Sequence, residues 1–181
     1  MSNLGTLTAK SYRILLYDEL EEYESAIEVL TQHLARNPTD GIAYNNRGLA
    51  CSEIGRGEEA LLDLERAIEF SSGDPIPFVN RGNLYERVRP IGDFDKAIED
   101  YSRAIAIDPN NPTFHRCKAH ACLKMERLED AIESFSNAIR LDSEFRQTYV
   151  DRGRAYERLG RKQEAKLDFD RANKLPTFRK R

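Results

Sequence analysis

The 181-residue sequence contains no tryptophan, only 10 glycines and only three cysteines, and it has no long apolar run. No stretch reaches the length of apolar residues that a membrane-spanning helix needs, and the first ten residues lack the basic-then-apolar order of a signal peptide. Cys51, Cys117 and Cys122 are an odd number without a regular spacing, which favours a reduced compartment over a secreted disulfide framework. We therefore expect a cytoplasmic protein without a membrane span.

The residues that are abundant favour helices with many exposed faces. Charged residues make up 33% of the chain and hydrophobic residues 40%, and the formal net charge is −3. This length suits one domain or one repeat array rather than several catalytic domains.

A repeat of about 34 residues runs through the sequence. An alanine recurs with spacings of 34, 37, 34 and 34 residues, at Ala26, Ala60, Ala97, Ala131 and Ala165. A large apolar residue follows four positions later in each case, and a glycine shares one upstream register at Gly48, Gly82 and Gly153. The predicted repeats are residues 7 to 40, 41 to 74, 75 to 111, 112 to 145 and 146 to 179, with 180 to 181 as a basic tail.

Each repeat is predicted to form two antiparallel helices in which small residues face large ones. The eighth place of a repeat, such as Gly48, should oppose the twenty-fourth place, such as Leu64, because these places lie at the same level of the helix pair. Residues such as Tyr44-Asn-Asn-Arg-Gly48, followed by Ala60, Leu64 and Ala67, resemble the tetratricopeptide repeat (TPR) family. The resemblance implies an all-α, right-handed α-solenoid of five helix-turn-helix units that acts as a non-enzymatic interaction scaffold.

Three repeats depart from the family pattern. The first carries Lys10, Ile14 and His33 at places where an aromatic residue, glycine and alanine are usual, so we interpret it as a degenerate cap. The third holds three extra residues, 89 to 91, and Pro90 should end its first helix. The last has Lys166 and Asn173 at places that are apolar in other repeats, which predicts a polar C-terminal cap.

Covariation between two repeat places predicts structural ion pairs. Arginine at the seventh place accompanies aspartate at the twenty-third, in the pairs Arg47 with Asp63, Arg81 with Asp100, and Arg152 with Asp168. Such pairs should fix the register of the helices more than they stabilise the fold, because desolvation offsets their attraction.

Apparent catalytic and metal motifs are better explained by the repeat. Gly55-Arg-Gly57-Glu-Glu-Ala60 fits a dinucleotide-binding pattern, but a predicted helix precedes it where that pattern needs a strand. Cys117 and His120 share a helical face, yet His115 and Cys122 fall on inward places, so only two of the four ligands of a structural zinc site remain. We expect no cofactor, no metal and no enzymatic activity.

The first helices of the repeats should line a concave groove, which in the TPR family typically receives an extended peptide or a partner helix. The asparagines could hold a peptide backbone and the basic residues could bind carboxylates, which favours an acidic or mixed-charge peptide. The predicted groove residues are Asn46, Asn80, Asn83, Arg87, Arg116, His120, Lys124, Arg154 and Arg158.

Some members of the family hold chaperone carboxy termini through a clamp of Lys, Asn, Asn, Lys and Arg, and this sequence contains only fragments of that clamp. The five clamp positions can be aligned with this sequence in two ways, and in neither alignment does a cationic position hold Lys or Arg. The aligned residues are Val79, Asn83, Cys117, Gln147 and Asp151, or Ser11, Leu15, Asn46, Ile76 and Asn80. We therefore expect no chaperone carboxylate clamp.

The charge is uneven along the chain, with net values of −4, −4, −1, −1 and +7 for residues 1 to 40, 41 to 74, 75 to 111, 112 to 145 and 146 to 181. An acidic amino-terminal end and a basic carboxy-terminal end could dock between copies, so head-to-tail self-association is the alternative function. The short basic cluster Phe178-Arg-Lys-Arg181 could instead contact nucleic acid or anionic lipid, but a single cluster beside an acidic array disfavours both.

Overall fold

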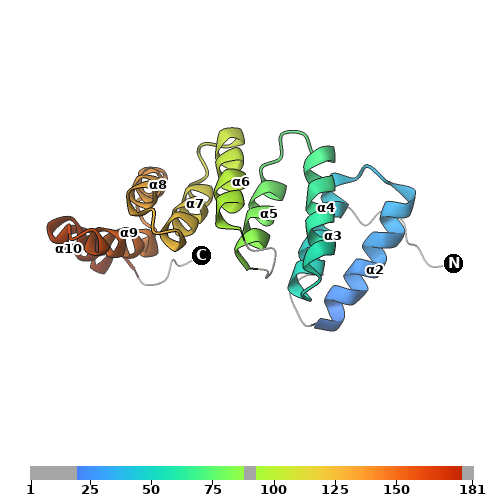
Figure 1. Ribbon diagram of the computed structural model, residues 1–181, viewed down its shortest axis with the longest axis horizontal. Helices are drawn as coiled ribbons and strands as arrows, with labels where there is room; N and C mark the ends of the chain where they lie inside the picture. The colour runs from blue at the N-terminus through green and yellow to red at the C-terminus, as the bar shows by residue number, and fades with distance from the viewer. Residues whose placement is uncertain (1–19, 88–92, 177–181) are drawn as a thin grey trace. The chain divides into compact units, whose positions relative to one another are not determined.

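The computed structural model describes residues 20–87 and 93–176, and all the regular secondary structure in these ranges is α-helical (Figure 1). This confirms the expected all-α fold. The helices are α2 (Leu20–Arg36), α3 (Gly41–Glu53), α4 (Gly57–Phe70), α5 (Ile76–Arg87), α6 (Phe94–Ile107), α7 (Pro112–Lys124), α8 (Leu128–Leu141), α9 (Arg146–Arg158) and α10 (Lys162–Asn173).

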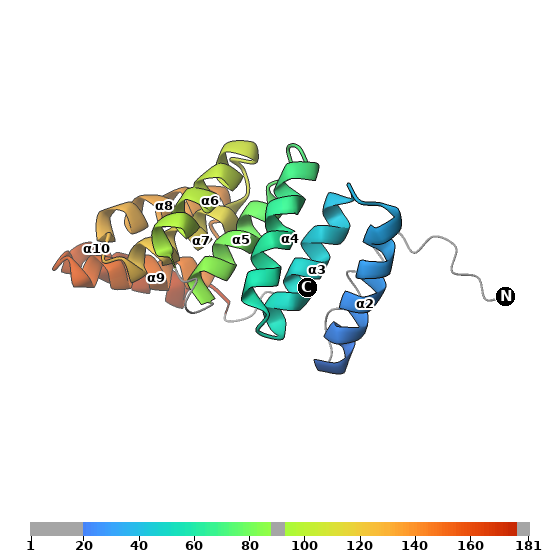
Figure 2. The same cartoon turned by 45° about the vertical axis from the view of Figure 1, so that its right-hand side comes forward.

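The chain divides into two compact units. Unit 1 is Met1–Asp93 and contains α2 to α5, and unit 2 is Phe94–Arg181 and contains α6 to α10. Within unit 1, α3 packs against α2 and against α4, and Figure 2 shows α3 beside each of them. Within unit 2, the antiparallel partners α7 and α8 pack together, as do α9 and α10.

Local sequence signals set the helix ends. Asp40 caps α3 by accepting a hydrogen bond from the Ala43 amide at 3.0 Å, and Asn111 caps α7 in the same way, with Pro112 in the first turn. Gly55 has a φ of 79° in the turn between α3 and α4. The glycine-rich stretch that fits a dinucleotide motif is therefore a helix-to-helix turn, and its glycine supplies a left-handed backbone conformation.

Small residues oppose large residues inside the helix pairs. A methyl group added at Gly48 would lie 3.1 Å from Leu64 Cγ, and one added at Gly153 would lie 2.7 Å from Phe169 Cε1. Ala60 and Ala131, from the recurring alanine register, are fully buried. The glycines thus allow the backbones to approach closely, as the register predicts.

Two of the predicted ion pairs are formed. Arg47 Nη2 lies 2.7 Å from Asp63 Oδ1, and Arg152 Nη2 lies 2.7 Å from Asp168 Oδ1; in each pair the arginine Nε also donates to the second carboxylate oxygen at 2.8 Å. The third pair, Arg81 with Asp100, joins residues of different units and stays a prediction.

Several predicted features lie outside the described residues. These are Lys10 and Ile14 in the first repeat, the insertion at 89 to 91, and the basic tail at 180 to 181. In the last repeat, Lys166 and Asn173 lie on α10 and are exposed. None of the helices in the described ranges is long and apolar enough to cross a membrane.

Candidate functional site

In unit 1, three asparagine side chains on α3 and α5 lie next to one another. We call the surface that they form with the residues at its two ends the unit-1 face; its residues are Ile42, Asn45, Asn46, Glu53, Ile76, Asn80 and Arg87. Asn80 Nδ2 donates to Asn45 Oδ1 at 2.8 Å, and Asn45 Nδ2 donates to Asn46 Oδ1 at 3.4 Å. Asn45 and Asn46 are buried and Asn80 is half-buried. An asparagine amide can both donate and accept, and Asn80, the half-buried member of the three, is the one that a bound chain can reach.

The unit-1 face has an apolar end and a charged end. Ile42 is 49% exposed and Ile76 is 43% exposed, at the same place of consecutive repeats near the starts of α3 and α5. At the other end, Arg87 donates to both carboxylate oxygens of Glu53 at 2.7 and 3.3 Å. The hydrogen bond with Arg87 lowers the pKa of Glu53 below its ordinary value.

In unit 2, we call the corresponding surface of α7 and α9 the unit-2 face, and Asp151 lies at the centre of its polar contacts. This buried carboxylate accepts a hydrogen bond from Gln147 Nε2 at 2.9 Å and lies 3.5 Å from Arg154 Nη1 and 3.6 Å from His120 Nε2. The ring of His120 also packs edge-on against Phe135, with 5.2 Å between the ring centroids. Three side chains thus surround one acidic group, and we call this arrangement the Asp151 cluster.

Further basic residues lie on α7 and α9, the helices that carry the Asp151 cluster. Arg116 donates to Thr113 Oγ1 at 2.8 Å and stacks over the ring of Phe145 at 4.3 Å. Arg158 pairs with Glu126, and Lys124 is exposed at the end of α7. Glu126 holds a φ of 58°, which is unusual for a residue other than glycine.

The nine predicted groove residues lie on α3, α5, α7 and α9, but many of them have partners within the chain. Arg87 and Arg158 are in ion pairs, Arg116 is stacked on an aromatic ring, and Asn46 is buried. Asn83 is half-buried on α5. Arg87, Arg116 and Arg158 are therefore held by their neighbours, whereas Lys124 and Arg154 are exposed.

The nine predicted residues do not include Asp151 or the two glutamates that pair with arginines, although the repeat places expected to point into the groove also hold Glu53, Gln147 and Asp151. Glu53 and Arg87 occupy the same place in consecutive repeats, so their opposite charges were a usable signal. Gln147, Asp151 and Arg154 follow one another at helical spacing, which was a second signal. No sequence signal indicated the pair of Arg158 with Glu126, because Glu126 lies in a turn.

Two of the four histidine and cysteine residues between 115 and 122 are buried within the described part of the chain. His115 Nε2 lies 3.1 Å from the Pro109 carbonyl oxygen, and His115 and Cys122 are buried. No cluster of three or more His, Cys, Asp or Glu side chains in the described ranges could hold a metal ion. Burial raises the pKa of Cys122, and it raises that of Cys51 to about 11.

Comparisons with known proteins agree with this architecture. A family model described as tetratricopeptide repeat matches residues 13–75 and 118–175, and a second, described as TPR repeat, matches residues 91–126. These matches cover more than half of the chain. The chain therefore belongs to the tetratricopeptide repeat family.

Individual relatives are similar over different shares of the chain. The Hsp70-Hsp90 organizing protein 3 of Arabidopsis thaliana is 32% identical over 94 residues, which cover 52% of this chain and 16% of that protein. The chain thus spans only a small part of this curated relative. Tetratricopeptide repeat protein 6 of Homo sapiens is 27% identical over 161 residues, covering 87% of this chain and 30% of that protein.

Among solved structures, the crystal structure of MamA superposes with a TM-score of 0.80 at 20% identity and covers 94% of this chain and 95% of that one. At this identity the likeness supports the fold. Proteins with this fold are typically non-enzymatic scaffolds for protein interactions, and membership of the family supports that general role.

Proposed function

We propose that the protein is an interaction scaffold that binds an acidic or mixed-charge segment of a partner protein, as an extended peptide or a helix, on the faces formed by α3 and α5 and by α7 and α9. The observation that carries the proposal is the unit-2 face, where the cations of Lys124 and Arg154 are exposed and Arg154 Nη1 lies 3.5 Å from the buried Asp151. Exposed cations on a fixed scaffold attract carboxylates and speed the encounter with an acidic partner.

The Asp151 cluster supports this function by orienting its neighbours. Gln147 and Arg154 contact the same Asp151 oxygen, while His120 approaches the other. A side chain that is already ordered loses less conformational entropy when a ligand binds. The cluster thus presents the cation of Arg154, which remains exposed, in a limited range of positions.

The unit-1 face supports binding of a chain with less charge. The half-buried amide of Asn80, which Asn45 holds, can donate to and accept from a peptide backbone, and the exposed side chains of Ile42 and Ile76 offer an apolar contact. The two faces therefore differ in chemistry: the unit-1 face suits a segment with little charge, and the unit-2 face suits an acidic one.

A chaperone tail remains disfavoured as the partner. One relative is named for organizing Hsp70 and Hsp90, but two of the cationic clamp places in one alignment hold Val79 and Asp151 here. The compartment in this proposal is the cytoplasm, which fits the absence of a disulfide at Cys51, Cys117 and Cys122.

The test uses synthetic peptides of equal length with acidic, neutral or basic sequences, and binding to the full chain is followed by fluorescence anisotropy at two salt concentrations. We expect the acidic and mixed peptides to bind, more weakly at high salt. Changing Lys124 and Arg154 together to Ala should weaken binding by about tenfold, since two exposed charge contacts contribute up to about 1 kcal/mol each.

Arg140→Ala is the matched control, because Arg140 is an exposed cation on α8 of the same unit and lies away from the proposed face. Equal loss in the control and in the Lys124/Arg154 variant would point to unspecific charge attraction and contradict the proposal. Preference for basic peptides would contradict it as well.

Head-to-tail self-association is the second candidate, and the charge distribution favours it. Residues 1 to 40 carry a net charge of −4 and residues 146 to 181 carry +7, so opposite ends of two copies attract each other. Sedimentation velocity at low and high salt tests it. Assembly that disappears at high salt supports this function, whereas a monomer under both conditions excludes it.

A further inference from the structure

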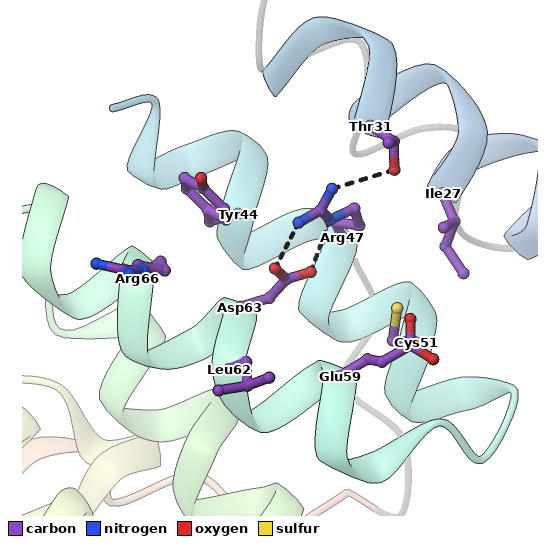
Figure 3. A pocket seen from close by; sticks show the side chains of 9 residues that line it. All are labelled: Ile27, Thr31, Tyr44, Arg47, Cys51, Glu59, Leu62, Asp63 and Arg66. Atoms are coloured by element: carbon purple, nitrogen blue, oxygen red, sulfur yellow. Dashed lines mark hydrogen bonds and ion pairs between the residues drawn. The ribbon is translucent and has the colours of Figure 1, made fainter. Parts of the chain in front are cut away.

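Unit 1 contains a pocket that the groove residues do not line. It lies between α2 and α4 with α3 as its floor, and its volume is about 490 Å³ (Figure 3). The residues around it are Ile27, Thr31, Tyr44, Arg47, Cys51, Glu59, Leu62, Asp63 and Arg66. On α3 these are the fourth, seventh and eleventh places of the repeat, which lie on a different helical face from the groove places.

The guanidinium of Arg47 is fixed in the centre of this pocket. It makes two bonds to Asp63, and its Nη1 donates to Thr31 Oγ1 at 3.1 Å. Figure 3 shows Tyr44 towards one end of the pocket and Cys51 at the other, with the Arg47–Asp63 pair between them. Leu62 is 64% exposed at the pocket, although it is a large apolar residue. The pocket therefore combines an ordered cation with an uncovered apolar wall.

The same set of residues recurs in unit 2, 105 positions further along the chain. Seven of the nine types are identical, a serine replaces Thr31, and a tyrosine replaces Cys51; the set is Ile132, Ser136, Tyr149, Arg152, Tyr156, Glu164, Leu167, Asp168 and Arg171. The contacts match too. Arg152 makes two bonds to Asp168 and one to Ser136 Oγ at 2.9 Å, and Leu167 is 69% exposed.

The only large difference between the two sets is therefore an aromatic ring. In unit 2, the ring of Tyr156 lies 5.8 Å from the Arg152 guanidinium carbon and 4.7 Å from that of Arg161. In unit 1 the corresponding residues are Arg47, Arg56 and Cys51. Arg56 holds Glu59 at the pocket by a bond of 2.8 Å, as Arg161 holds Glu164 in unit 2. Unit 1 thus has both arginines, but a cysteine in place of the ring at position 51.

We propose that the unit-1 pocket binds an aromatic side chain of a partner protein, which takes the place that Tyr156 occupies in unit 2. The ring would lie against the Arg47 guanidinium and contact Ile27 and Leu62. Arg47 cannot turn away, because Asp63 and Thr31 hold it, so a ring gains the cation–π attraction without first ordering the cation. An aliphatic side chain would gain the apolar contact but not this attraction, which makes the pocket selective for aromatic residues.

The inference does not depend on the proposed peptide groove, because the pocket and the unit-1 face lie on different faces of α3. A partner could occupy either site alone. A partner that reaches both would bind more tightly than either contact predicts, since the second contact would be intramolecular.

The experiment is a nuclear magnetic resonance titration of the full chain with two short capped peptides, Gly-Tyr-Gly and Gly-Leu-Gly. The tyrosine peptide should shift the signals of Thr31, Cys51 and the Arg47 side chain in a saturable manner, and the leucine peptide should not. Cys51→Tyr should abolish these shifts, because the chain's own ring then fills the pocket as in unit 2.

Tyr156→Cys is the second variant, and it keeps the test decisive even if Cys51→Tyr fails to fold. It should create a second site, with new saturable shifts at Ser136 and Arg152. Lys124→Ala with Arg154→Ala should leave the tyrosine peptide's binding unchanged, which separates this inference from the proposed peptide face.

Three results would overturn the inference. Equal binding of the two peptides would remove the selectivity for a ring. Retention of the shifts in a folded Cys51→Tyr protein would place the binding elsewhere. Shifts of the same signals that appear with rising protein concentration and no peptide would make a second copy of the chain the occupant instead of a separate partner.

Discussion

The Arg47–Asp63 pair offers a sharp test of how the repeats are held together, through the substitution Asp63→Asn. The side chains are 21% and 9% exposed, so the pair is largely desolvated. Replacing the carboxylate with an amide of the same shape leaves the Arg47 cation without its counterion. Breaking a fully buried pair costs about 3–5 kcal/mol. Because Arg47 keeps some contact with water, we expect a loss of about 2–3 kcal/mol.

Urea unfolding followed by circular dichroism measures this loss. With a slope of about 2 kcal/mol per molar urea, the midpoint should fall by about 1–1.5 M. The double variant Arg47→Met with Asp63→Leu should recover most of the stability, since an apolar pair of similar volume avoids the desolvation cost.

The exposed pair of Arg56 with Glu59 is the control, with side chains 46% and 56% exposed. Glu59→Gln should cost less than about 0.5 kcal/mol, because water screens this pair. If Asp63→Asn also costs less than about 0.5 kcal/mol, or if the double variant is no more stable than Asp63→Asn, the reasoning about desolvation is wrong.

Three further predictions concern packing, backbone strain and ionisation. Gly153→Ala should cost about 1–3 kcal/mol in urea unfolding, because the new methyl meets Phe169 Cε1 at 2.7 Å, and Phe169→Leu in the same chain should recover part of it. Glu126→Gly should raise the unfolding free energy by about 0.5–1 kcal/mol, because glycine adopts a φ of 58° without strain; an unchanged or lower value would contradict this. Alkylation at pH 8 should be slower at Cys51 than at the half-buried Cys117, because burial raises the pKa of Cys51 to about 11. Because burial favours the neutral Cys51 thiol, this contribution to the unfolding free energy is complete below the ordinary thiol pKa of 9.0 and is lost as the pH rises towards 11. The unfolding free energy should therefore fall between pH 9 and pH 11, as the shift of the Cys51 pKa to about 11 requires.

The sequence predicted the packed core well because the repeat supplies its own internal comparison. Each place appears several times, so a glycine at the eighth place opposite a large residue at the twenty-fourth can be recognised by recurrence. The pairing of Arg47 with Asp63 followed from the same comparison, since both residues changed together in repeat four, which has Lys118 and Ser134.

The candidate faces were predicted less completely. Helical spacing placed Asn80 and Arg154 on the correct helices, but it did not indicate that Asn80 bonds to Asn45 or that Asp151 gathers Gln147, His120 and Arg154. These contacts depend on side-chain rotamers and on the distance between neighbouring helices. The repeat pattern specifies which face a residue occupies and leaves its partners open.

The sequence by itself determined the all-α class, the repeat register and the residues that pack inside each helix pair. These follow from residue types that recur at the same places in five repeats. Only the tertiary structure decided which charged groups pair on the faces, such as Arg158 with Glu126, and where a pocket opens. The pocket beside Cys51 depends on the side chains of three helices together. A missing ring becomes visible only when the surrounding residues, and their counterparts around Tyr156, are placed in space.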